Sequence, residues 1–158
     1  VTNASGRQVT ILSAGNDSSK SFNVVGTDVN GDSLTENVTG ANAGTATSSG
    51  YFKTIASITA VGNPAGNVSA GINANAADVI FAGRTRLKGF SFVSGGTAGK
   101  ANIRNGSVTG TEVVQFRSIG TDDSSEDPFI PDEGILFKDG CFVTFVVPQF
   151  DLMMFYHA

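Results

Sequence analysis

Three oxygen-bearing side chains at alternate positions are the nearest approach to a metal site in this sequence. Asp28, Asn30 and Asp32 have the spacing with which a calcium-binding loop begins. The pattern then departs from such a loop, because Ser33 stands where glycine is needed and no bidentate glutamate follows at the twelfth position. Asn30-Gly31 between two strand-like runs explains the same residues as the tip of a β-hairpin. The hairpin is the favoured interpretation, and no metal or other cofactor is expected.

A run of carboxylates in the second half of the chain is another candidate for chemistry. Paired carboxylates hydrolyse glycosides when they are held across a sugar cleft. Here they lie in a serine-rich stretch, and the sequence has no Trp on which a sugar could stack. A solvated loop, or a loop that meets a basic partner, is the favoured interpretation. The run comprises Asp122, Asp123, Glu126, Asp127, Asp132 and Glu133.

His157 and Cys141 are the only histidine and the only cysteine of the chain. A lone imidazole and one cysteine within an apolar run build neither a catalytic triad nor a metal site. Cys141 has no partner for an internal disulfide and is expected to be a small core residue. The sequence also lacks the hydrolase, phosphate-loop and dinucleotide-binding motifs. We therefore expect a protein that is not an enzyme and has no catalytic residues.

The apolar residues that would form a core are concentrated between Ile135 and Tyr156. Asp139-Gly140 lies between two β-rich runs, which predicts a two-residue hairpin with Phe137 opposite Phe142. Both faces of this ribbon carry apolar side chains, so neither face can be left to water. We expect the ribbon to be covered on two sides, by its own domain and by another chain.

Either a neighbouring subunit or the N-terminal module could cover the second apolar face of the ribbon. A module of roughly 75 residues has little surface left to cover a second apolar face, which favours a neighbouring subunit in a homo-oligomer such as a trimer. The alternative is a monomer in which the N-terminal module folds over the C-terminal strands. The residues expected at a subunit interface are Phe142, Phe145, Met153, Phe155 and Tyr156.

Short strand-like runs and turn signals alternate along the rest of the chain. The 20 glycines and the scarcity of Leu, Glu and Lys argue against helices. The predicted fold class is all-β, with antiparallel β-sandwich or barrel-like modules built from short strands and tight turns. The small polar stretch Asn73 to Gly83 is expected to divide an N-terminal β module, residues 1–78, from a C-terminal β module, residues 84–158.

The charge of the chain excludes some classes of partner. Its net charge is −4, whereas a nucleic-acid groove needs clustered lysines and arginines, so no nucleic acid is expected. Arg84, Arg86 and Lys88 are three alternate residues, which we interpret as one solvated edge of a strand. No signal peptide and no apolar run of membrane-spanning length is present, so no membrane partner is expected.

Two stretches resemble proteins of tailed-bacteriophage particles. Ser21 to Ile58 contains Val-Val-Gly-Thr-Asp-Val-Asn-Gly-Asp-Ser and resembles a β module that recurs in virion proteins of tailed phages. Arg86 to Ala158 contains Leu-Lys-Gly-Phe-Ser-Phe-Val-Ser-Gly-Gly, and later Ile-Pro-Asp-Glu-Gly-Ile-Leu-Phe. This second stretch resembles a small protein common in marine and other phage genomes. The resemblance offers no catalytic residues to transfer.

What the resemblance implies is a structural component of the virion. The favoured role is a capsid decoration or cement protein that assembles on the particle, in the cytoplasm of the bacterial host, with other virion proteins such as the major capsid protein. A phage tail or head–tail accessory protein is the alternative within this class. A secreted adhesin or carbohydrate-binding module is the alternative from another class. That alternative needs exposed aromatic platforms, and the lack of Trp, with only 2 Tyr, weighs against it.

Overall fold

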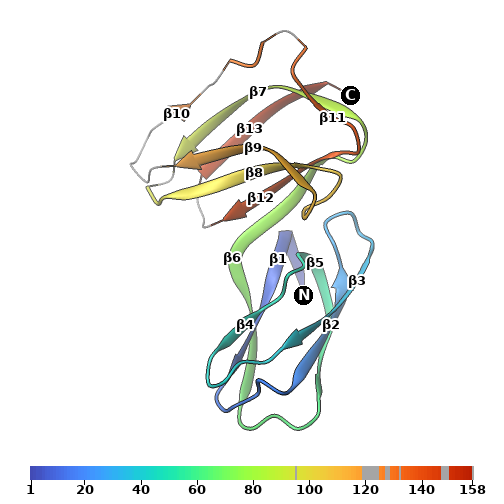
Figure 1. Ribbon diagram of the computed structural model, residues 1–158, viewed down its shortest axis with the longest axis vertical. Coiled ribbons are helices and arrows are strands. Elements are labelled where there is room, and N and C mark those ends of the chain that lie inside the picture. The colour runs from blue at the N-terminus through green and yellow to red at the C-terminus, as the bar shows by residue number, and fades with distance from the viewer. Residues whose placement is uncertain (95, 119–124, 127–128, 132, 147–149, 158) are drawn as a thin grey trace. The chain divides into compact units, whose positions relative to one another are not determined.

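The computed structural model describes residues 1–94, 96–118, 125–126, 129–131, 133–146 and 150–157. Every regular element in this part of the chain is a β-strand, and the sheets are antiparallel and packed face to face (Figure 1). The predicted all-β, sandwich-like fold class is therefore confirmed. The chain divides into two compact units, Val1–Ala76 and Ala77–Ala158.

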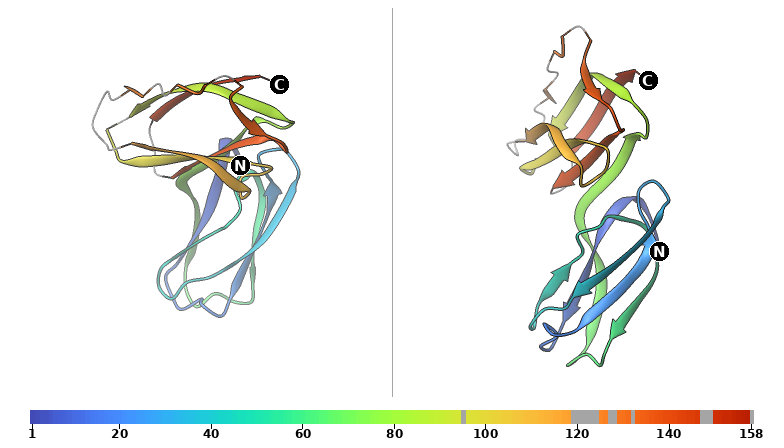
Figure 2. Two further views of the ribbon diagram at one scale, coloured as in Figure 1. Left: turned by 45° about the horizontal axis from the view of Figure 1, so that its top comes forward. Right: turned by 45° about the vertical axis from the view of Figure 1, so that its right-hand side comes forward.

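The first unit is sandwich-like, with strands of 3 to 14 residues (Figure 2), and it has a core of its own. The strand order is β3-β2-β5-β1-β6, and β4 also pairs with β1. β5 pairs with β1 near its start and with β2 over most of its length. Apolar residues of β1, β2 and β5 contribute to one common core. The strands are β1 (Thr2–Ser13), β2 (Ser21–Thr27), β3 (Ser33–Thr39), β4 (Thr45–Thr47), β5 (Phe52–Val61) and β6 (Val68–Phe81). The buried core residues are Val9, Ile11, Phe22, Val24, Val38 and Phe52.

The hairpin predicted at Asn30-Gly31 is present and joins β2 to β3. The Gly31 N–H donates to the Asp28 carbonyl at 3.2 Å, and Gly31 has a φ of 89°. This is the pattern of a type I turn followed by a glycine bulge. The Asp28 Oδ1 accepts from the N–H groups of Asn30 at 2.8 Å and Asp32 at 3.0 Å. The carboxylate of Asp28 therefore holds the turn together.

The second unit is a sandwich of two sheets. One sheet has the order β6-β12-β8-β9, with the end of β6 as its first strand. The other is built on β7, which pairs with β13 along almost its whole length, so β10 and β11 share the opposite side of β7. The strands are β7 (Thr85–Ser94), β8 (Gly99–Asn105), β9 (Thr111–Ser118), β10 (Ser125–Glu126), β11 (Ile135–Phe137), β12 (Cys141–Val146) and β13 (Phe150–His157).

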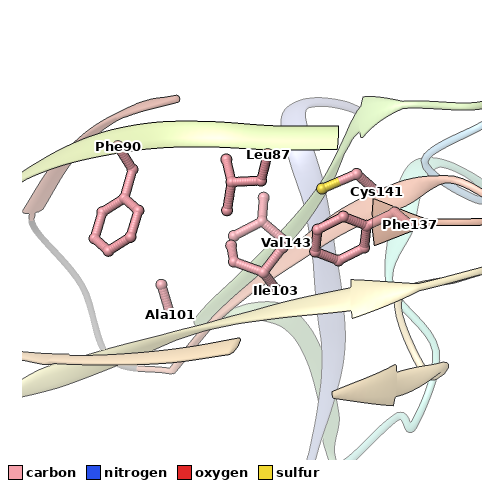
Figure 3. Close-up of a cluster of buried hydrophobic side chains, with 7 residues drawn as sticks. All are labelled: Leu87, Phe90, Ala101, Ile103, Phe137, Cys141 and Val143. Atoms are coloured by element: carbon pink, nitrogen blue, oxygen red, sulfur yellow. The ribbon is translucent and has the colours of Figure 1, made fainter. Parts of the chain in front are cut away.

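The core of the second unit lies between these two sheets. Figure 3 shows side chains from β7 and β11 on one sheet and from β8 and β12 on the other, all directed into the space between them. They are Leu87, Phe90, Ala101, Ile103, Phe137, Cys141 and Val143. The apolar residues that the sequence concentrates near its end thus meet partners that lie 34 to 56 residues earlier in the chain.

The two-residue hairpin predicted at Asp139-Gly140 is wrong. β11 pairs with β7 and β12 pairs with β8, so this segment connects the two sheets and does not join neighbouring strands. Only Gly140 has a positive φ, 108°, whereas a type I′ turn requires it at both central residues. The Asn105 Nδ2 donates to the Asp139 Oδ2 at 2.9 Å, and the Gly106 N–H donates to the Gly140 carbonyl at 3.1 Å. These bonds fix the connection beside the β8–β9 turn.

The stretch expected to separate two strand-rich halves is largely strand. Residues 73–81 form the later part of β6, and the division between the units falls at Ala76 and Ala77, inside this strand. Asn73 and Asn75 both direct Nδ2 to the Gln8 Oε1, at 3.4 Å and 3.1 Å. The small polar residues therefore continue a sheet, and the division between the units falls within a strand.

Candidate interaction surface

The groups singled out for catalysis do not meet in the described part of the chain. His157 is exposed, and its backbone carbonyl accepts a hydrogen bond from the Thr85 Oγ1 at 2.9 Å. Cys141 is buried, and burial raises the pKa of its thiol to about 12, so the reactive thiolate is negligible near neutral pH. Among the described residues, no three His, Cys, Asp or Glu side chains are grouped so that they could hold a metal ion.

The structure describes one carboxylate of the acidic run, that of Glu133. It is exposed, and its Oε2 lies 3.1 Å from the Arg86 Nη2. Of Glu126 only the backbone is described, and it pairs with Phe92 in β7. The remaining members lie outside the described residues: Asp122, Asp123, Asp127 and Asp132.

The five residues expected at a subunit interface have different surroundings. Phe155 and Tyr156 are exposed, at 54% and 49%. Phe142 is buried, and Phe145 packs partly buried against the core of the second unit, so the protein itself covers these two. The side chain of Met153 lies outside the described residues, while its backbone pairs with Ser91. The exposed aromatic residues of the expected set are therefore those at the end of β13.

The register between β13 and β7 places these two rings on different faces of the sheet. Met154 stands opposite Phe90 and packs against the core, so Phe155, the next residue, points to the outer face of the sheet. There it stands opposite Gly89, where an added Cβ would lie 3.6 Å from the Phe155 ring. The register then shifts by one residue, so Tyr156 stands opposite the core residue Leu87, and its ring centroid lies 5.6 Å from that of Phe81.

β13 is also an edge strand, because its only described neighbour is β7. The outer edge of such a strand presents unpaired N–H and C=O groups to another chain. β9, the last strand of the other sheet, is protected against such pairing by an extra residue, Val113, that shifts its register, and by the charged side chains of Glu112 and Arg117. β13 instead has two exposed aromatic residues, Phe155 and Tyr156, just before its last residue, His157. We call the free edge of β13, with Phe155 and Tyr156, the β13 surface.

The sequence identifies the aromatic residues of this surface but not its strand edge. Whether a strand has one or two neighbours depends on pairings that no local pattern reports, and β13 pairs with a strand that begins at Thr85. In the described part of the chain, no helix has the length and apolar character needed to cross a membrane.

No protein-family model, curated protein or solved structure matches this chain. The β13 surface and the sandwich fold are the structural features that bear on function.

Proposed function

We propose that this chain is a non-enzymatic structural component of a tailed-bacteriophage particle, and that it is a capsid decoration protein. The resemblance of Ser21 to Ile58 and of Arg86 to Ala158 to phage proteins suggests the class. The observation that carries the proposal is the β13 surface, which offers a partner both free backbone groups and exposed aromatic side chains. A decoration protein works by binding, and a free strand edge with exposed aromatic rings supports such a role.

The strength of one such contact can be estimated. A Phe or Tyr side chain exposes roughly 200 Å² in an extended chain, and about half of that remains accessible at Phe155 and Tyr156. Burying both would contribute about 5 kcal/mol at 25 cal/mol per Å². Association costs about as much or more in lost translational and rotational freedom. A single β13 contact is therefore weak, and many copies on one shell would bind firmly through repetition.

The partner that fits the β13 surface is a strand edge of a neighbouring copy or of a capsid protein. An added strand makes main-chain hydrogen bonds along β13, and its side chains cover the two rings. Most soluble oligomers are symmetric assemblies of identical chains. We accordingly propose a homo-oligomer on the particle surface, in contact with the major capsid protein.

Phe155→Asp tests this proposal, with Phe129→Asp as a matched control. Phe129 is 87% exposed and lies in the same unit but outside β13, so its replacement adds the same charge elsewhere. Light scattering after size-exclusion chromatography, and co-sedimentation with capsids that lack the protein, should show that wild type and Phe129→Asp associate. Phe155→Asp should bind at least about tenfold more weakly, because a buried unpaired charge costs well over 1.4 kcal/mol.

Two results would exclude the proposal. One is a wild-type protein that stays monomeric at micromolar concentration and does not co-sediment with capsids. The other is a purified virion in which peptides of this chain are absent by mass spectrometry.

A further inference from the structure

A small cavity of about 220 Å³ lies on the second unit, beside the end of β13. Pockets for drug-sized molecules have volumes of roughly 300–1,000 Å³, so this one suits a single chemical group and not a whole cofactor. Its wall is unusually basic for a chain with a net charge of −4. The lining residues are Arg84, Thr85, Arg86, Leu136 and His157.

The strand register brings the donors of this cavity together. Arg86 in β7 stands directly opposite Leu136 in β11 and opposite His157 in β13. Cross-strand partners project to the same face with their Cβ atoms about 5 Å apart, so the guanidinium and the imidazole are neighbours. The Thr85 Oγ1 donates to the His157 carbonyl at 2.9 Å and ties the end of β13 to β7. Arg84 lies two residues before Arg86 and completes the wall.

One carboxylate already sits against this group. The Glu133 Oε2 lies 3.1 Å from the Arg86 Nη2, and the Glu133 carbonyl accepts from the Arg86 Nη1 at 3.2 Å. The Glu133 side chain is 81% exposed, and an ion pair so open to water is worth little, so another anion can displace it. The guanidinium of Arg84 has no partner among the described residues. The cavity thus contains two permanent positive charges and one weakly held negative charge.

We propose that this cavity binds one oxyanion group, a carboxylate or a phosphate, between the guanidinium groups of Arg84 and Arg86. Guanidinium is planar and always charged, and its parallel N–H donors match two oxygens of such a group. The imidazole of His157 supplies a further N–H donor from the neighbouring strand. Glu133 acts as an internal competitor that occupies Arg86 while the site is empty. The site includes His157 of β13 but neither Phe155 nor Tyr156, and it does not depend on the proposed role in a virion.

Nuclear magnetic resonance titration of the full, ¹⁵N-labelled chain tests the proposal at constant ionic strength. Sodium phosphate and sodium acetate are added in separate experiments, and both should shift the amide signals of residues 84–86 and 157 to saturation. Arg84→Gln should lower the affinity for both anions by about tenfold, since it removes a charge-assisted donor. Glu133→Gln should raise the affinity for both anions by about threefold, since it removes the competing carboxylate. The spectrum of each variant also shows whether it is folded.

The control is Arg117→Gln, which removes the same charge from β9 and should leave the affinity within about twofold. Tighter binding of phosphate would identify a phosphate group as the ligand, and tighter binding of acetate a carboxylate such as an acidic side chain. Shifts that grow linearly without saturating would overturn the proposal. Equal weakening by Arg117→Gln and Arg84→Gln would also overturn it, as would an unchanged affinity in Glu133→Gln.

Discussion

Raising the pH from 8 to 10 should destabilise the second unit through Cys141. The thiol is 1% exposed, and burial raises its pKa from 9.0 to about 12. Because the pKa is higher in the folded state, the folded protein keeps a proton that the unfolded protein loses between these two values. The stabilisation is therefore complete below pH 9 and is lost as the pH rises towards 12.

The size of the effect follows from these two pKa values. At pH 10 about nine in ten unfolded thiols have lost the proton, against about one in a hundred folded thiols. The free energy of unfolding should then be about 1.4 kcal/mol lower at pH 10 than at pH 8 through this group alone. Cys141→Ala should cost about 1 kcal/mol at pH 8 because it leaves a small cavity in the core. It should also remove this part of the pH dependence.

Urea unfolding followed by circular dichroism at pH 8, 9 and 10, with a reductant present, measures the free energy of unfolding of wild type and of Cys141→Ala. The transition of the second unit is the one that Cys141→Ala shifts, and all other titrating groups are common to the two proteins. Wild type should lose about 1.4 kcal/mol more than the variant between pH 8 and 10. Equal losses would refute the reasoning, and so would rapid labelling of the folded wild-type thiol by a disulfide reagent at pH 8.

Three further predictions concern the first unit, each measured by urea unfolding. Gly26→Ala should cost more than about 2 kcal/mol, because its Cβ would lie 1.9 Å from the Thr54 carbonyl oxygen. Gly44→Ala is the control, because the nearest atom to its added Cβ beyond the adjacent residues is the Asn42 carbonyl oxygen at 3.6 Å; a comparable loss there would contradict the steric argument. Glu36→Ala should cost about 2 kcal/mol, because the carboxylate accepts from two backbone N–H groups at 2.7 Å and 2.8 Å; a loss below about 0.5 kcal/mol would show that water replaces these bonds. Asp28→Ala should cost about 1 kcal/mol through the turn, equally in calcium and in a chelator, whereas a loss confined to calcium would point to a metal at this loop.

Local pattern was enough for the fold class and for one hairpin. Glycine-rich turns between strand-like runs predicted an all-β protein, and Asn30-Gly31 joins β2 to β3 as expected. The same kind of signal failed at Asp139-Gly140, because a tight turn constrains only the direction of the chain. Which strands then pair depends on the apolar surface that each arrangement buries, and here Phe137 and Val143 meet from opposite sheets.

The wrong strand pairing predicted at Asp139-Gly140 also affected the prediction of the interface residues. Two apolar faces on one hairpin would need an external cover, whereas two strands in facing sheets cover each other. Phe142 is accordingly buried within the chain, while Phe155 remains exposed on an outer face. The basic cavity could not be predicted from the sequence, because Arg86 and His157 are 71 residues apart and become neighbours only through the β7–β13 pairing.

β6 sets the order in which the chain can fold while it is being synthesised. Its first part completes the first unit, whose other strands all end by Val61. Its last part pairs with β12, which begins only at Cys141, and β7 pairs with β13 later still. Contacts between such distant residues form slowly, because long loops have to close first. The first unit can therefore fold early, while the chain is still being synthesised. The second unit cannot close its core until residues 135–157 have left the ribosome.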